Sequence, residues 1–278
     1  MSARAITVCL AVALPGAQAA AVEPPSPSPT PPAVADPRLV FSTNGARLTG
    51  GSGGGGGSAT WVGDITPQVV IGAGAEYQQI ANAHWTTGNF SGALALGGEQ
   101  RKTHLYIEAH EGAGDVGDHA FHYSLASLGL LGQLTPELTL QLEERYIDVD
   151  TSHGSLPKLG LTYRATLQLS ASVSYAKSFA GNLGTRLVTG RIDYAGIRFN
   201  AIAGLAGGPA APAVIFSGPG VNFVKPAPQL REAFVGIGKP LQRTDWLLLG
   251  DYQDVGGIRR TSVTLACTVH LRAHGQPQ

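Results

Sequence analysis

The chain has 278 residues, and its 19 Lys and Arg balance 19 Asp and Glu, so its formal charge is zero at neutral pH. Only 14% of the residues are charged, against about 25% in a typical soluble domain, while glycine is unusually frequent at 38 residues. A neutral chain lacks the basic footprint of a nucleic-acid-binding protein, and no run of about 18 apolar residues after the N-terminus could form a spanning helix.

The first 19 residues have the layout of a secretory signal peptide. Arg4 precedes an apolar run over residues 5–14, and Ala17-Gln18-Ala19 supplies the small residues of a cleavage site. We predict a signal peptide over residues 1–19 and export from the cytoplasm. Because Cys9 lies in the removed segment, Cys267 is left alone and no intramolecular disulfide is expected in the mature chain.

Residues 20–37 follow as a proline-rich periplasmic tether. The stretch Glu23 to Pro37, EPPSPSPTPPAVADP, holds too many prolines for a helix or a sheet ladder and is expected to be extended and solvated. Its composition fits a simple spacer, a segment that binds a periplasmic partner, or a plug that enters a pore.

From Arg38 onward, apolar and polar residues alternate with period two, which indicates β-strands with two different faces. In the clearest stretch, residues 159–175, a three-residue loop at 164–166 would set Tyr163 opposite Leu167 on one face. We count fourteen such segments, at residues 38–48, 58–65, 68–80, 86–97, 102–110, 119–132, 137–147, 157–164, 167–176, 185–194, 197–205, 229–239, 243–252 and 258–271.

The predicted connections alternate in length. Tight turns are expected near residues 66–67, 98–99, 135–136, 165, 195–196 and 241–242, and longer loops at 50–58, 81–85, 111–118, 148–155, 178–184, 207–229 and 254–257. Short turns at one end and long loops at the other are typical of bacterial outer-membrane barrels, in which both termini are periplasmic when the strand number is even.

The composition of the polar face favours a membrane barrel over a soluble β-sandwich, which also alternates. A water-facing sheet normally carries Lys and Glu, whereas this face is mostly Ser, Thr, Gly, Ala and Gln. Aromatic residues near strand ends would form interfacial girdles; they are Trp61, Tyr77, Phe121, Tyr163, Tyr175, Tyr194, Trp246 and Tyr252.

In hydrocarbon every backbone group must be paired, so the sheet has to close. We therefore predict an all-β fold: a transmembrane, antiparallel up-and-down β-barrel of about 14 strands over residues 38–272, with residues 273–278 as a C-terminal tail. Sixteen strands are the alternative.

This pattern resembles the Gram-negative outer-membrane β-barrel class. The resemblance implies a location in the cell outer membrane and contact with outer-membrane lipid and lipopolysaccharide. Leu161-Thr162-Tyr163-Arg164 and the Thr135-Pro136 turn before Leu138-Thr139-Leu140 are similar to YaiO-type barrels and to the barrels of polysaccharide-export proteins. In contrast to the usual C-terminal aromatic residue of the class, Leu271 is followed here by seven further residues.

Charged and histidine side chains on the other strand face would line the lumen, which at fourteen strands is wide enough to conduct. The pore-lining candidates are Glu76, His104, Glu108, Glu143, Arg145, Arg164, Arg191, Asp193, Arg198, Glu232, Arg260 and His270. Their mixed signs predict a polar pore without strong ion selectivity. The alternative is a closed lumen in which these groups pair with one another.

The longest predicted loop, residues 207–229, is unusually apolar. Val214-Ile215-Phe216 and the stretch 221–224 flank Gly218-Pro219-Gly220, which is a hairpin signal. A constriction folded into the pore and a partner-binding loop are the alternatives.

Catalysis and metal binding receive less support. One strand face carries His104, Tyr106, Glu108 and His110. His122 and Ser124 on the next strand would complete the residue types of a metal site or a hydrolase. However, the apolar residues at 121, 123 and 125 are expected to face lipid, which turns His122 and Ser124 inward, away from a lipid substrate. We predict no catalytic residue, no metal site and no cofactor.

Two further groups are expected in loops: Asp148, Asp150 and His153, and Glu111, Asp115 and Asp118. They could hold divalent cations that bridge lipopolysaccharide, or be solvated loop charges. The sequence thus predicts an outer-membrane channel that passes, or helps export, a small polar or saccharide-type solute, and no enzyme. A non-conducting structural or assembly barrel and an outer-membrane lipid hydrolase are the alternatives.

Overall fold

The computed structural model describes residues 7–10, 37–66, 68–96, 103–149, 152–209, 214–217, 229–241 and 243–271. Within these ranges the chain forms strands and turns, and no helix is long and apolar enough to cross a membrane. Most of the predicted signal peptide and tether, and the C-terminal tail, lie outside the described residues.

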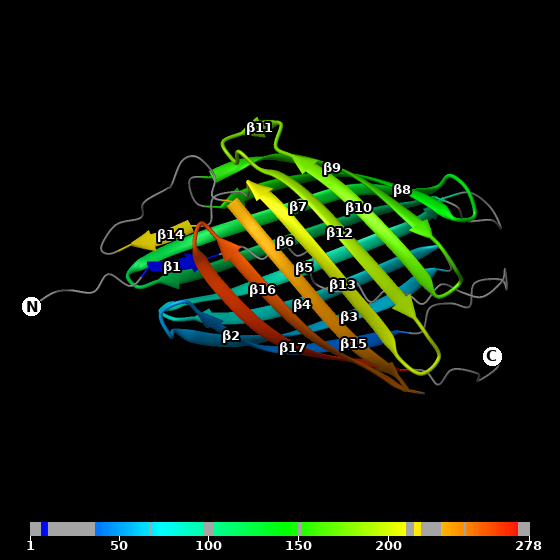
Figure 1. Cartoon of the computed structure of the whole chain (residues 1–278), viewed down its shortest axis with the longest axis horizontal. Coiled ribbons are helices and arrows are strands. Elements are labelled where there is room, and N and C mark those ends of the chain that lie inside the picture. The colour runs from blue at the N-terminus through cyan, green and yellow to red at the C-terminus, as the bar shows by residue number, and fades with distance from the viewer. Residues whose placement is uncertain are drawn as a thin grey trace, which may run out of the picture.

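Fourteen antiparallel strands of the described chain close into one barrel (Figure 1). Neighbours in the sheet follow the chain order, and the last strand pairs with the first from Arg260 opposite Leu48 to His270 opposite Arg38. The barrel strands are β2 (Arg38–Leu48), β3 (Gly53–Thr66), β4 (Val69–Ile80), β5 (Ala83–Leu96), β6 (Thr103–Val116), β7 (His119–Gln133), β8 (Leu138–Val149), β9 (Ser152–Arg164), β10 (Leu169–Lys177), β12 (Arg186–Ala195), β13 (Asn200–Pro209), β15 (Gln229–Pro240), β16 (Thr244–Val255) and β17 (Ile258–His270). The predicted closed up-and-down barrel is confirmed.

Three short strands lie outside this ring. β11 (Ala180–Gly181), within the connection between β10 and β12, pairs with β9. β14 (Val214–Ser217) pairs with β1 (Thr7–Leu10). The partner that the sequence suggested for β14, residues 221–224, lies outside the described residues, and cleavage near Ala19 would release β1.

Both ends of the barrel chain lie on one side, where the Leu271 N–H donates to the Pro37 carbonyl at 2.8 Å. We refer to this as the periplasmic end and to the opposite end as the extracellular end, following the convention of outer-membrane barrels.

The predicted long loops are wrong for most extracellular connections. Residues 81–82, 117–118 and 256–257 are two-residue turns, and the glycine run read as a flexible connection is already strand from Gly53. Two longer connections remain, residues 178–185 and 210–228. Residues 53–57 and 111–116 contain glycines and charged residues, which are typical of loops. In the structure they belong to β3 and β6 and continue the strand pairing beyond the apolar band.

The hairpin between β9 and β10 has a different register from the predicted one. Tyr163 lies opposite Ala171, and five residues separate the last pair, Arg164 and Ser170. The number of unpaired residues is odd, as predicted, so the same faces still meet. The turn is therefore longer than the predicted three-residue loop. Two hydrogen bonds hold it: the Leu169 N–H donates to Thr166 Oγ1, and the Ala165 N–H donates to the Leu169 carbonyl.

Exposed apolar side chains form a band around the outside of the barrel, as a lipid-facing surface requires. Aromatic residues border this band at both ends. Trp61, Tyr163, Tyr194 and Trp246 lie toward the periplasmic end, and Tyr77, Tyr146, Tyr175 and Tyr252 toward the extracellular end. Seven of the eight predicted girdle residues therefore lie on the outward face.

The eighth, Phe121, points inward and is only 3% exposed. The predicted facing of β7 is wrong at this end: positions 121, 123 and 125 face the lumen, and His122 faces outward with Ser124. Beyond the girdle the outside meets headgroups and water, so polar residues point out. The sequence pattern inverts because the inside, not the outside, is apolar there.

Candidate channel lumen

The structure puts ten of the twelve predicted pore-lining residues on the inward face of barrel strands. They are Glu76, His104, Glu108, Glu143, Arg145, Arg191, Asp193, Glu232, Arg260 and His270. Arg164 lies exposed at the periplasmic rim, at the last position of β9, and Arg198 lies in the exposed turn 196–199. Arg198 is therefore not part of a barrel strand. A role in permeation stays a prediction for the others.

One charged cluster lies on the wall formed by β6, β8 and β9. Glu143 accepts hydrogen bonds from Tyr106 Oη at 2.9 Å, Gln141 Nε2 at 3.2 Å, Arg145 Nη2 at 2.5 Å and Lys158 Nζ at 3.2 Å. The side chains of Glu143 and Arg145 are only 3% and 9% exposed. Opposite charges held this closely compensate for the loss of hydration that each would suffer alone.

Gly129 makes this cluster possible. It lies between Tyr106 and Glu143 in the cross-strand row. A Cβ at Gly129 would lie 2.0 Å from Tyr106 Cζ. Without a side chain there, the Tyr106 ring extends over β7 to reach Glu143 two strands away.

A second cluster lies on β16 and β17. Asp251 Oδ1 accepts hydrogen bonds from Ser262 Oγ at 2.8 Å and Arg260 Nη2 at 3.2 Å. Glu232 on β15 and Gln253 face the same space. The strand order puts β16 six strands from β8 one way round and eight the other, so the two clusters lie on nearly opposite walls of the lumen.

A third ion pair lies on β12. Arg191 Nε donates to both carboxylate oxygens of Asp193, at 2.8 and 2.9 Å. Both side chains are about a fifth exposed, so water reaches this pair more readily than Glu143. Together the three groups form a polar waist of mixed sign.

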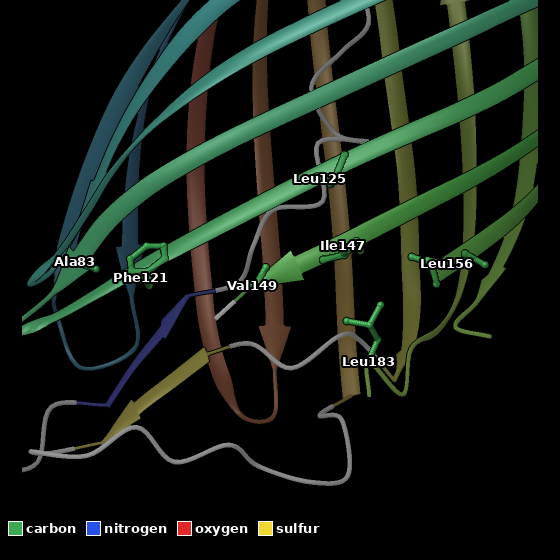
Figure 2. Close-up of a cluster of buried hydrophobic side chains, with 8 residues drawn as sticks. Ala83, Phe121, Leu125, Ile147, Val149, Leu156 and Leu183 are labelled. Atoms are coloured by element: carbon green, nitrogen blue, oxygen red, sulfur yellow. The ribbon is translucent and has the colours of Figure 1, made fainter. Parts of the chain in front are cut away.

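A cluster of buried apolar side chains, which we call the apolar collar, lies on one side of the barrel between this waist and the extracellular end (Figure 2). Its buried residues come from β5, β7, β8, β9 and β10 and from the 178–185 connection: Ala83, Phe121, Leu125, Ile147, Val149, Leu156, Ala176 and Leu183. Trp85 and Tyr123 pack against them, and Tyr123 Oη is hydrogen-bonded to Thr87 Oγ1.

Leu183 reaches the collar because its connection folds back over β9. The Phe179 N–H donates to the Ser155 carbonyl at 3.0 Å, and the Asn182 N–H to the His153 carbonyl at 2.9 Å. A Cβ at Gly154 would lie 2.9 Å from Leu183 Cγ, so Leu183 fills the space that Gly154 leaves.

The sequence prediction missed Lys158, Asp251 and the collar. Lys158 and Asp251 each share the inward parity of their strands, which a strict period-two frame would have indicated. The collar could not be recognised in this way. Its inward-facing apolar residues alternate along the strands as lipid-facing residues do, so the pattern assigns them to the wrong face.

The residues considered for catalysis and metal binding do not come together. His122 and Ser124 face outward, which reverses the prediction, and among the described residues no hydrogen bond joins Ser124 to a histidine. Glu111 and Asp115 belong to β6 and Asp148 to β8, not to loops, while Asp150 lies outside the described residues. Within the described ranges, no group of three His, Cys, Asp or Glu side chains could hold a metal ion.

Comparison with known proteins places the fold. No family model matches the chain, and no curated protein matches it. Among solved structures, the CymD monoaromatic hydrocarbon channel has a TM-score of 0.59 at 9% identity, over 87% of this chain and 90% of that one. A Pseudomonas aeruginosa FadL homologue has 0.57 at 9%, over 85% and 91%. The P. putida toluene transporter TodX has 0.56 at 8%, over 87% and 92%.

At such low identity the likeness shows the fold alone. It agrees with the closed ladder and with the exposed apolar band between two aromatic girdles. The chain is an outer-membrane-type β-barrel, as its sequence predicted.

Proposed function

We propose that the protein is an outer-membrane channel that passes a small polar or saccharide-type solute. The observation that carries this proposal is the polar waist, where Lys158, Arg191 and Arg260, with side chains 26%, 21% and 16% exposed, present hydrogen-bonding groups from β9, β12 and β17. Such groups replace part of the hydration that a polar solute loses inside a pore.

The collar fits the same class of solute. A sugar ring has apolar C–H faces as well as hydroxyl groups, and the partly buried Trp85 and Tyr123 offer aromatic surface near the extracellular end. A solute with both characters would meet the apolar surface first and the polar waist next.

A closed structural barrel is the second candidate. It is favoured by the pairing of the waist charges with one another, above all Glu143 with four donors. Charged side chains that pair with one another hold the wall rigid and leave fewer hydrogen-bonding groups for a solute.

The two candidates differ in conductance. Purified, refolded protein in a planar lipid bilayer should give discrete current steps, and proteoliposomes should swell in neutral sugars of one or two rings. Protein that is inserted and β-rich but electrically silent would support the structural barrel and contradict the channel.

A further inference from the structure

Outward-facing charges at the extracellular end are segregated by sign around the barrel. The wall from β10 round to β2 carries exposed cations beyond the apolar band: Arg47, Lys177, Arg186, Arg231 and Arg259. We call these five residues the basic face. Among the described strands of this sector, Asp254 is the one outward carboxylate at this end, 3.6 Å from Arg259.

The opposite sector has the reverse charge. At the extracellular ends of the described β6 to β9, the outward charges are Glu111, Asp115, Glu144 and Asp148, and no Lys or Arg points outward there. The cations of the basic face are therefore not neutralised by the acidic residues of the same barrel.

Cross-strand pairing within the basic face leaves cations facing one another. Lys177 lies directly opposite Arg186. Like charges directly opposite destabilise a sheet, and this pair is exposed at the level of the membrane headgroups. An anion held between the two side chains would remove the repulsion.

An apolar groove of about 760 Å³ lies beside the basic face, toward the membrane centre. It crosses the wall from β10 to β17 that faces the viewer in Figure 1. Small outward residues on successive strands form its floor, and larger ones its sides. The floor is formed by Gly190, Ala203, Ala233 and Gly250, which follow one another diagonally, and the sides include Leu205 and Val235.

The groove and the basic face are continuous. Thr261, which lines the groove, is paired with Arg47. Arg231 and Arg259 each precede a groove residue by two positions on the same outward strand face, namely Ala233 and Thr261. A ligand with an anionic head and an apolar chain could thus contact both at once.

We propose that this surface binds lipopolysaccharide, the phosphorylated glycolipid of the outer leaflet. Its phosphates contact the basic face, where arginine side chains can hold them bidentately. One acyl chain lies in the groove, whose volume is within the roughly 300–1,000 Å³ of ordinary small-molecule sites. Clustered basic residues beside an apolar membrane surface are a general signature of anionic-lipid binding. The proposal concerns the outer surface and does not depend on conduction through the lumen.

The test measures binding of lipid A to the full-length protein in detergent, by native mass spectrometry over a range of lipid concentrations. The double variant R231Q/R259Q should bind lipid A at least about tenfold more weakly than wild type, because two phosphate contacts are lost. The matched control is K239Q/R243Q, which removes the same charge from exposed sites at the periplasmic end and should bind as wild type does. Raising the salt concentration should weaken wild-type binding more than that of R231Q/R259Q.

A second variant tests the groove separately. A203F/A233F fills the floor and keeps every cation, so it should lose affinity for lipid A but keep that for the de-acylated phosphosugar. Equal binding of lipid A by wild type and R231Q/R259Q would overturn the proposal. So would equal loss in the control, or equal binding of phosphatidylglycerol and lipid A. A detergent-stable dimer that A203F/A233F dissociates would instead assign the groove to a second copy of the chain.

Discussion

Glu143 illustrates how much depends on single side chains inside the barrel. Its carboxylate holds Arg145, which is 9% exposed, and Lys158 to the same wall. We expect E143Q to lower the free energy of unfolding by about 3 kcal/mol, because Arg145 is left as a buried charge without its partner. Urea unfolding of the refolded protein in lipid vesicles measures this difference.

The neighbouring carboxylate supplies the control. Glu144 is exposed on the outward face, where it accepts a hydrogen bond from Ser155 Oγ. E144Q should change stability by less than about 1 kcal/mol, as is usual for exposed charges. If E143Q and E144Q unfolded at the same urea concentration, the cluster around Glu143 would not be holding the wall.

Arg191 is the inward arginine best placed to affect permeating ions. Its side chain is 21% exposed, so it is reached by water inside the lumen. In R191E, two units of charge about 10 Å from a passing ion would change its energy by roughly 0.8 kcal/mol in water. We expect a several-fold rise in cation preference at low salt, read from reversal potentials in a salt gradient.

Charge reversal at Arg164 and Arg198 tests whether ion selectivity depends on where an arginine lies or only on the total charge. Arg164 and Arg198 are exposed at the periplasmic rim and in a turn, where bulk water and salt screen them more strongly. R164E and R198E should shift the reversal potential less than R191E does. Equal shifts from all three variants would show that the total charge, and not the waist, sets selectivity.

At the scale of elements, the 178–185 connection folds over β9 at the extracellular end. Leu183 is 2% exposed and packs where Gly154 has no side chain. We expect G154V to displace the connection, because its first side-chain carbon alone would lie 2.3 Å from the Ala180 carbonyl oxygen and 2.9 Å from Leu183 Cγ. Single-channel currents should become larger and noisier.

Phe179 provides the control on the same connection. Its side chain is 88% exposed, so F179S should leave the current amplitude unchanged. Unchanged currents in G154V, from protein that still unfolds cooperatively, would mean that Leu183 does not limit the mouth.

The existence of the strands could be predicted from the sequence because period two persists through most of their length, but their extracellular ends and their facing could not be predicted everywhere. In β7, Leu128 faces lipid whereas Leu125, three residues earlier, belongs to the collar. Leucine thus faces lipid at one position and the lumen at the other, and only the closed barrel structure distinguishes the two. The cluster around Glu143 was equally hidden, because Lys158 and Tyr106 are 37 residues or fewer from it in sequence yet meet it only through ladder register.

For the molecule as a whole, the position of the apolar band between the two girdles defines how the barrel sits in the bilayer. Beyond the extracellular girdle, outward-facing residues are polar and inward-facing residues are apolar. This is the reverse of the arrangement within the apolar band. The segregation of outward charge beyond the girdle then gives the barrel one acidic and one basic side. Lipid contacts should accordingly differ from one side of the barrel to the other.

The three tryptophans report directly on this arrangement. Trp61 and Trp246 are exposed in the periplasmic girdle, whereas Trp85 faces the lumen beside the collar. Lipids brominated on their acyl chains quench indoles that they contact. We expect strong quenching in W85F/W246F, which keeps Trp61, and in W61F/W85F, which keeps Trp246. W61F/W246F, which keeps Trp85, should retain nearly all its emission, because the barrel wall separates that ring from lipid. Strong quenching of Trp85 would mean that β5 presents its other face to the membrane, and with it that the collar lies outside the lumen.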